Sequence, residues 1–208
     1  MKPDLLKRYT SLPVLLDILS NKKLTLLDPK SWEDQNDSYY LNLYKEKLGL
    51  KSVLALCFTE APETFHHWKV FSGNSSAVGI HFYKEELLKK INGNSGIKSD
   101  YVIYKLLNEA RTTPPTISEL PFVKRHAFKD EVEFRLIYES KTEEIAGKDV
   151  KINIKSIERI TLGPWIPKPV FQSVKSVINN IKGCSQIKVF RTTIVDNRQW
   201  KNIGKKVA

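Results

Sequence analysis

The chain has 208 residues, a length that suits one domain of ordinary size. Because 41% of the residues are hydrophobic and 27% are charged, the composition predicts a packed core and excludes overall disorder or a disulfide-rich scaffold. The longest apolar run, residues 53–58, is too short to span a membrane, and the N-terminus lacks the apolar region of a signal peptide. We therefore expect a cytoplasmic protein with no membrane partner.

The net charge of +11 comes mainly from 27 lysines, against only 7 arginines. The lysines occur singly or in short pairs, a pattern typical of a solvated basic surface and also compatible with a nucleic-acid-binding groove. A nucleic acid and a protein both remain open as partners. Cys57 and Cys184 lie in or beside apolar segments without metal-ligand spacing, which predicts reduced, unpaired thiols.

Hydrophobic periodicity and turn residues predict the following order: helix 14–20, strand 24–27, polar loop 32–37, helix 38–48, strand 53–59, helix 62–71 stopped by Gly73, strand 77–82, helix 84–91, a strand leading into a helix at 97–107, loop 111–118, strands 133–138 and 157–162, helix 169–182 and strand 187–190. The connections vary too much in length for a regular alternation of parallel strands and helices. We therefore predict a single α+β domain over residues 1–208, with a mixed, mostly antiparallel sheet and flanking helices. The loop near 111–118 is expected to be flexible.

Three polar clusters interrupt the apolar pattern: residues 7–9, the loop 32–37 and the segment 130–135. If the last segment begins a strand, Glu131, Glu133 and Arg135 share one face of it. That row of charges is either an exposed cross-strand charge ladder or part of a site, and the spacing alone does not decide between them.

His66 and His67 form the one histidine pair in the sequence. Adjacent residues on a helix point about 100° apart, so the two rings are poorly placed to bind one metal ion. We expect one surface histidine, one partly buried histidine and no metal centre.

Eight short motifs, taken in order, carry a resemblance to a known family: Lys7–Ser11, Ile18–Leu24, Asp28–Asp34, Leu56–Glu60, Trp68–Gly73, Gly79–Phe82, Lys129–Ile137 and Ile160–Pro164. On these motifs the chain resembles the bacterial family of domain of unknown function 2971, which includes proteins linked to phage abortive infection. Residues 32–35 read Trp-Glu-Asp-Gln where the family has Phe-Asn-Asp-Pro, so only Asp34 matches there. Phe71 replaces the usual tyrosine.

The layout of that family is similar to ADP-ribosyltransferase folds, which carry an early Arg or His and a late strand with a catalytic Glu. The resemblance implies NAD as the dinucleotide used, in a transferase or glycohydrolase reaction. It assigns Arg8 to the dinucleotide and Glu133 to the ribose and its oxocarbenium-like transition state, so both belong to one site. The other residues expected to bind the dinucleotide are Tyr9, Trp32, Asp34, Trp68, Glu131 and Arg135.

Two other functions remain open at this point. A non-catalytic basic module that binds a nucleic acid or another protein would gather its lysines on one face and leave Glu131 and Glu133 exposed. A metal-dependent nuclease would use Asp34, Asp37 and Glu133 as ligands of a divalent ion. The enzyme hypothesis instead requires Arg8, a tryptophan and Glu133 around one cleft that accepts a dinucleotide.

Overall fold

The computed structural model describes residues 4–72, 76–94 and 96–205, which fold around a mixed nine-stranded sheet. The strands are β1 (Leu5–Ser11), β2 (Lys23–Leu27), β3 (Ser52–Thr59), β4 (Ala77–Tyr83), β5 (Ile97–Tyr101), β6 (Ile103–Lys105), β7 (Val123–Arg125), β8 (Glu133–Ser140), β9 (Gly147–Lys151), β10 (Ile157–Leu162) and β11 (Lys188–Arg191). The α-helices are α1 (Leu12–Asn21), α2 (Gln35–Lys47), α3 (Phe65–Ser72), α4 (Lys84–Ile91), α5 (Leu107–Thr112), α6 (Lys168–Asn180) and α7 (Arg198–Gly204). Short 3₁₀ helices are η1 (Pro29–Ser31), η2 (Ile117–Phe122), η3 (His126–Glu131) and η4 (Ile154–Ser156).

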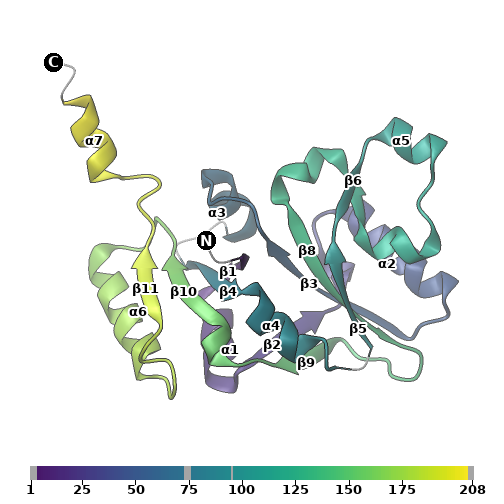
Figure 1. Ribbon diagram of the computed structural model, residues 1–208, viewed down its shortest axis with the longest axis horizontal. Helices are drawn as coiled ribbons and strands as arrows, with labels where there is room; N and C mark the ends of the chain where they lie inside the picture. Colours follow the sequence, from purple (N-terminus) through teal and green to yellow (C-terminus); the bar gives the residue numbers. More distant parts are fainter. Residues whose placement is uncertain (1–3, 73–75, 95, 206–208) are drawn as a thin grey trace.

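The large sheet runs in the order β11-β10-β4-β1-β3-β2-β9, and β8 followed by β5 continues from the other edge of β3. Its strands pair antiparallel except β10 with β11, and the separate pair β6–β7 is also parallel. Figure 1 shows α6 and α7 at one end of the molecule and α5 with β6 at the other. The predicted α+β class with a mixed, mostly antiparallel sheet is confirmed.

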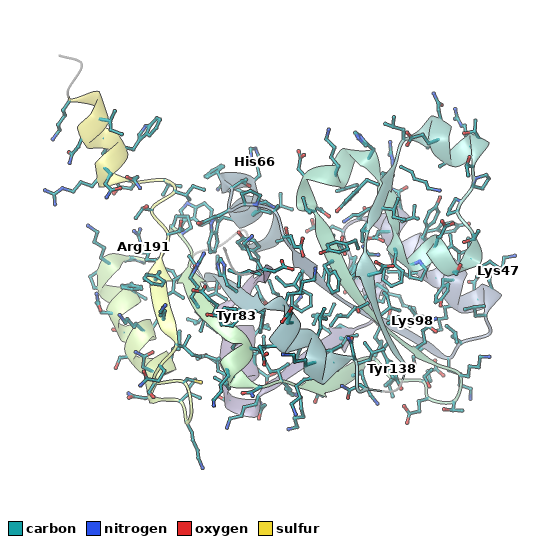
Figure 2. The ribbon with its side chains drawn as sticks, in the orientation of Figure 1. Lys47, His66, Tyr83, Lys98, Tyr138 and Arg191 are labelled. Atoms are coloured by element: carbon teal, nitrogen blue, oxygen red, sulfur yellow. The ribbon has the colours of Figure 1, made fainter. Side chains whose placement is uncertain are left out.

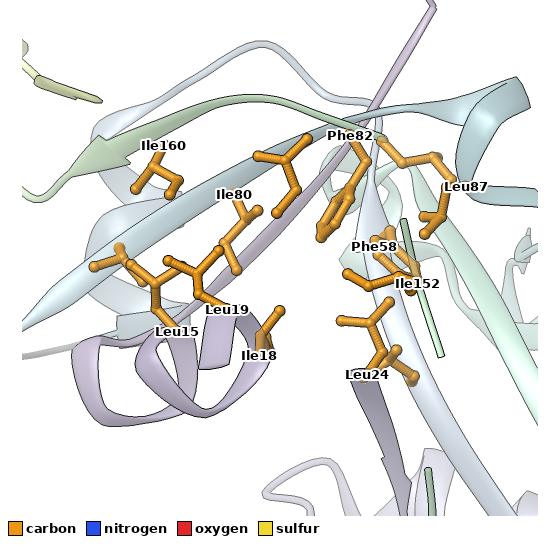
Figure 3. Packing of buried hydrophobic residues seen from close by; sticks show 14 of the residues in the cluster. Leu15, Ile18, Leu19, Leu24, Phe58, Ile80, Phe82, Leu87, Ile152 and Ile160 are labelled. Carbon is orange, nitrogen blue, oxygen red and sulfur yellow. The ribbon is translucent and has the colours of Figure 1, made fainter. Parts of the chain in front are cut away.

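The main hydrophobic core lies between the sheet and α1, α4 and α6. Leu15, Ile18 and Leu19 recur at helical spacing on α1 and pack in one cluster with Ile80 and Phe82 of β4, as Figure 3 shows. The apolar residues whose spacing predicted these helices therefore form the helix faces that are buried against the sheet. No helix in the described ranges has the length and apolar character needed to cross a membrane.

A smaller apolar cluster covers the opposite face of β3 and β8. Leu41 and Tyr44 of α2 pack there with Val53 and Ala55 of β3 and Ile137 of β8. Both faces of the β3–β8 pair are thus buried, and α2 is fixed against the sheet close to the polar residues at its N-terminus.

The largest difference from the sequence prediction lies at the N-terminus, where residues 5–11 form β1 although no element was predicted before the helix at 14–20. This strand pairs with β4 along its whole length, from Leu5 opposite Tyr83 to Ser11 opposite Ala77. Its sequence does not alternate between apolar and polar residues, and only Leu6 is fully buried, while the other six side chains are partly exposed.

The remaining differences concern short elements and boundaries. The strands β6, β7 and β9 and the helix α7 were not predicted. Helix α5 and η2 leave only residues 113–116 outside helices in the predicted loop 111–118. The flexibility of that loop stays a prediction. Gly73, expected to stop α3, lies outside the described residues.

The close approach of β10 and β4 predicts that Gly163 tolerates no side chain. A Cβ atom at this position would lie 2.9 Å from Ala77 Cβ and 3.0 Å from Ala77 O, both fixed by the backbone of β4. We expect Gly163→Ala to lower the free energy of unfolding by about 1–3 kcal/mol, measured by urea denaturation. Gly93→Ala is the control, because nothing lies within 4 Å of its added Cβ. Equal stability of the two variants would contradict the prediction.

Candidate functional site

A pocket opens where β1 and β2 diverge from β3. Because β8 pairs with β3 along its full length on one edge, β1 and β2 share the other edge, with Lys7 opposite Thr59 and Leu27 opposite Ala55. Residues of β3 between these two pairs line a pocket of about 400 Å³. Pockets of this size accept small molecules or a part of a larger one.

Side chains from distant parts of the sequence meet in this pocket. Six of the eight residues predicted from the sequence line it: Arg8, Tyr9, Trp32, Asp34, Glu131 and Glu133. The sequence analysis did not assign site roles to several other lining residues: Thr25, Cys57, Thr59, Lys124 and Phe128. Lys124 and Phe128 belong to no recognisable motif, so no signal in the sequence pointed to them.

Trp68 and Arg135 do not line the pocket, unlike the other six residues that the sequence assigned to the site. Trp68 is 1% exposed; its ring packs edge-on against Tyr9 at 5.0 Å, and its Nε1 donates to Glu63 at 2.7 Å. Arg135 is 0% exposed beneath the pocket. Both residues contact side chains that line the pocket, Tyr9 for Trp68 and Glu133 for Arg135, and their own contact with a dinucleotide stays a prediction.

The two adjacent histidines on α3 face different surroundings, as predicted. His66 is exposed (Figure 2), whereas His67 is buried, with its ring stacked on Tyr9 at 5.5 Å. Burial lowers the pKa of His67. Within the described ranges, no three His, Cys, Asp or Glu side chains are grouped so that they could hold a metal ion.

Arg135 is the centre of a buried charge cluster. Its Nη1 and Nη2 donate to the two carboxylate oxygens of Asp37, at 2.8 and 2.7 Å, and its Nε donates to Glu133 Oε1 at 2.7 Å. A further bond from Nη1 reaches Pro121 O at 2.9 Å. Lys124 completes the cluster, with its Nζ 2.7 Å from Glu131 Oε2 and 3.4 Å from Glu133 Oε2.

The strand that carries Glu133 begins at that residue, as the predicted strand 133–138 does, and Glu131 lies outside it. Val132 has a left-handed backbone with φ of 42°, so β8 starts at Glu133 and Glu131 ends η3. The predicted shared face is right for Glu133 and Arg135 and wrong for Glu131. Because Glu133 is 5% exposed, the exposed charge ladder is excluded.

The charge cluster keeps Glu133 ionised. Burial alone would raise the pKa of Glu133, but the charge and hydrogen bond of Arg135, together with the charge of Lys124, outweigh it and lower the pKa to about 2. For Glu131, burial prevails over Lys124 and raises the pKa. The pocket therefore presents two carboxylates with different acidities.

Arg8 differs from Arg135 in having no acidic partner. Its Nη1 donates to Cys57 O at 3.2 Å, while its Nε is buried without a hydrogen-bond partner, and no ion pair in the described part of the chain includes Arg8. Burial lowers the pKa of its guanidinium. An unpaired cation with a buried donor is costly, and an anionic ligand in the pocket would relieve that cost.

Trp32 and Asp34 occupy the wall at the start of α2. The Trp32 ring lies over the Arg135 guanidinium, 5.2 Å from its Cζ, and also lines the pocket. Asp34 caps α2, because its Oδ1 accepts from the backbone N–H groups of Asn36 and Asp37 at 3.1 and 3.4 Å. This cap explains why the helix begins at Gln35, inside the segment predicted as a loop.

The same contacts count against the proposed divalent-metal site. Asp37 directs both carboxylate oxygens to Arg135, and Glu133 is bound by Arg135 and Lys124. A carboxylate held by a guanidinium has little capacity left for a cation, so Asp34, Asp37 and Glu133 do not form a metal-ligand set.

The depressed pKa of Glu133 predicts a specific pH dependence of stability. A carboxylate whose pKa falls on folding stabilises the protein above its unfolded value of 4.5, and that stabilisation is lost as the pH falls towards about 2. We expect Glu133→Gln to unfold more easily at neutral pH, by about 3 kcal/mol, and to show a flatter stability profile between these pH values. Urea denaturation across the pH range measures both effects.

Glu85→Gln, on the exposed side of α4, is the matched control and should follow the wild-type profile. Parallel profiles for wild type and Glu133→Gln would show that Glu133 gains no acidity from folding.

No protein-family model and no curated protein sequence matches the chain, so these comparisons do not support the resemblance to domain of unknown function 2971. Among solved structures, the chain is similar to DarT of Thermus sp. 2.9 in complex with ADP-ribosylated single-stranded DNA, at 11% identity and a TM-score of 0.48, over 92% of this chain and 95% of that one. It is also similar to DarT with carba-NAD⁺ (15%, TM-score 0.46, 92% and 97% covered) and with NAD⁺ (14%, TM-score 0.47, 92% and 96% covered). A likeness this distant assigns no activity or residue role to this chain, and the phage-defence role stays a prediction.

Proposed function

We propose that this chain is an ADP-ribosyltransferase-like enzyme that uses NAD as its donor substrate. It transfers ADP-ribose to a nucleic acid or protein acceptor, or to water as a glycohydrolase. The observation that carries the proposal is that two groups line one pocket: a guanidinium without an acidic partner and a carboxylate held in its ionised form. Arg8 on β1 and Glu133 on β8 reach this pocket from opposite edges of β3.

The chemistry of the pocket matches two parts of NAD, the pyrophosphate and the nicotinamide ring. The Arg8 guanidinium has a free donor for an anionic oxygen, and a planar guanidinium binds phosphate groups with two parallel hydrogen bonds. Trp32 offers an aromatic face on the same wall, suited to a flat nicotinamide ring. Together these groups fit the pyrophosphate and the nicotinamide half of the dinucleotide.

Glu133 supplies the negative charge that the reaction needs. As the bond between ribose and nicotinamide breaks, positive charge builds on the sugar, and an ionised carboxylate close to it stabilises that charge. Arg135 and Lys124 occupy one lone pair on each oxygen, leaving further lone pairs for a ribose hydroxyl. Because Arg135 is locked by Asp37, the Glu133 carboxylate is also fixed in direction.

The two alternative functions fit the site less well. A basic binding module would leave Glu133 exposed, whereas it is buried within a charge cluster. A nuclease would need carboxylates free for a metal ion, and two of its three candidate ligands, Asp37 and Glu133, are held by Arg135. The net charge of +11 instead supports a nucleic acid as acceptor.

The direct test is to incubate the purified protein with NAD labelled in the nicotinamide ring, alone and with single-stranded DNA, RNA or protein extract. We expect release of labelled nicotinamide, measured by chromatography. Arg8→Lys should raise KM for NAD about tenfold, because a point charge cannot replace the planar fork. Glu133→Gln should lower kcat about 100-fold or more, per folded molecule.

Arg198→Lys, exposed on α7, is the control for Arg8→Lys and should leave both constants unchanged. Since Glu133→Gln also weakens the fold, its activity is compared at a temperature where circular dichroism shows both proteins folded. No nicotinamide release with any acceptor, or full activity per folded molecule in Glu133→Gln, would overturn the proposal.

A further inference from the structure

A second pocket, of about 460 Å³, adjoins the first at the N-terminus of α2. The two pockets share three lining residues, Asp34, Asp37 and Lys124. The other walls of the second pocket come from α2, from α5 and from the small β6–β7 sheet. A molecule bound there would therefore lie against one bound in the first pocket.

The second pocket combines aromatic, apolar and cationic side chains. Tyr39, which is 61% exposed, and Tyr40 provide aromatic faces, and Leu106 adds apolar surface. Lys105 and Arg125 line the same pocket, and neither has an acidic ion-pair partner within the described ranges. Aromatic rings beside unpaired cations are the features with which proteins bind single-stranded nucleic acids, through base stacking and phosphate contacts.

Of the three shared residues, only Asp34 has a polar atom to spare. Both oxygens of Asp37 are bonded to Arg135, and Lys124 is paired with Glu131 and Glu133. Asp34 uses Oδ1 to cap α2, while its Oδ2 is buried with no hydrogen-bond partner in the described part of the chain. A buried carboxylate oxygen without a partner is unfavourable, and a donor group arriving from either pocket would satisfy it.

We propose that the second pocket holds the acceptor nucleotide of a single-stranded nucleic acid, and that Asp34 Oδ2 accepts the proton of the attacking group. This inference rests on the proposed use of NAD in the first pocket. The C1′–N bond to nicotinamide breaks, and its electron pair leaves with the nicotinamide nitrogen. An O–H or N–H group of the acceptor forms the new bond to C1′, and its proton passes to Asp34. The products are ADP-ribosylated acceptor, neutral nicotinamide and one proton.

In this arrangement the donor and the acceptor bind in different pockets, which adjoin at the N-terminus of α2. Arg8 and Glu133 act on the donor in the first pocket, whereas Asp34 acts where donor and acceptor meet. Loss of Asp34 should therefore affect transfer to the acceptor more than it affects attack by water, which needs no site of its own.

The first experiment compares wild type with Asp34→Asn. Asparagine caps a helix as well as aspartate does, so α2 is kept while the proton acceptor is removed. The reaction contains labelled NAD and a short single-stranded DNA oligonucleotide, and both released nicotinamide and ADP-ribosylated oligonucleotide are quantified. We expect the ratio of transfer to hydrolysis to fall by about 100-fold or more. An unchanged ratio would overturn the role of Asp34.

The second experiment measures binding without any reaction, by fluorescence anisotropy of a labelled single-stranded DNA oligonucleotide at fixed salt. Arg125→Ala and Lys105→Ala should each weaken binding about tenfold. Arg198→Ala removes the same charge from α7, at the far end of the molecule in Figure 1, and should bind as wild type does. Equal weakening by all three variants would show general charge attraction and overturn the second pocket as the binding site.

The two experiments separate failure of this inference from failure of the proposed function. If wild type releases no nicotinamide, the proposed function fails and the role of Asp34 fails with it. If nicotinamide is released but ADP-ribose goes to protein and not to the oligonucleotide, the proposed function stands and only the nucleic-acid acceptor is overturned.

Discussion

The buried guanidinium of Arg135 binds three parts of the chain that are far apart in sequence. It holds Asp37 at the start of α2, the carbonyl of Pro121 in η2 and Glu133 at the start of β8. Removing one partner from such a buried cluster leaves an uncompensated charge, which typically costs about 3–5 kcal/mol. The position of α2, and with it Asp34 and Trp32, depends on this cluster, as does the direction of the Glu133 carboxylate. Both pockets are therefore built on one fully satisfied cation.

Arg8 and Arg135 differ sharply in how their guanidinium groups are bonded. Both arginines lie against β3, but Arg135 donates to two carboxylates and a carbonyl, whereas Arg8 donates to a single carbonyl and keeps a buried Nε without a partner. The single hydrogen bond of Arg8 contributes little to the stability of the fold, whereas loss of an Arg135 partner would leave a buried charge uncompensated. The buried Nε of Arg8 and the buried Oδ2 of Asp34, both without a hydrogen-bond partner in the described residues, are the atoms at which we propose that ligands bind.

The backbone decides where these groups can meet. One edge of β3 is fully paired with β8, while the other edge is shared by β1, which pairs at Thr59, and β2, which pairs at Ala55. Because of the gap between β1 and β2, the Arg8 side chain reaches the pocket. Without that gap, a charged side chain on a central strand would be covered by its neighbours. Glu133 reaches the same space from the opposite edge of β3, because it lies opposite Thr59 in the register of β3 and β8.

The sequence by itself determined the elements whose burial is one-sided or continuous: helices α1, α4 and α6, and strands β3, β4 and β10 follow from apolar spacing that any local segment reveals. It also pointed to six of the residues that line the pocket, through the order of short motifs. Only the tertiary structure decided that residues 5–11 form a central strand, since their pairing with β4 is non-local and leaves no alternation. Likewise, the polar segment 130–135 pointed to Arg135 and the family resemblance pointed to Trp68, but neither signal could tell a satisfied buried group from an exposed one. That difference depends on partners such as Asp37, which lies 98 positions away and is brought close only by the packing of α2 on the sheet.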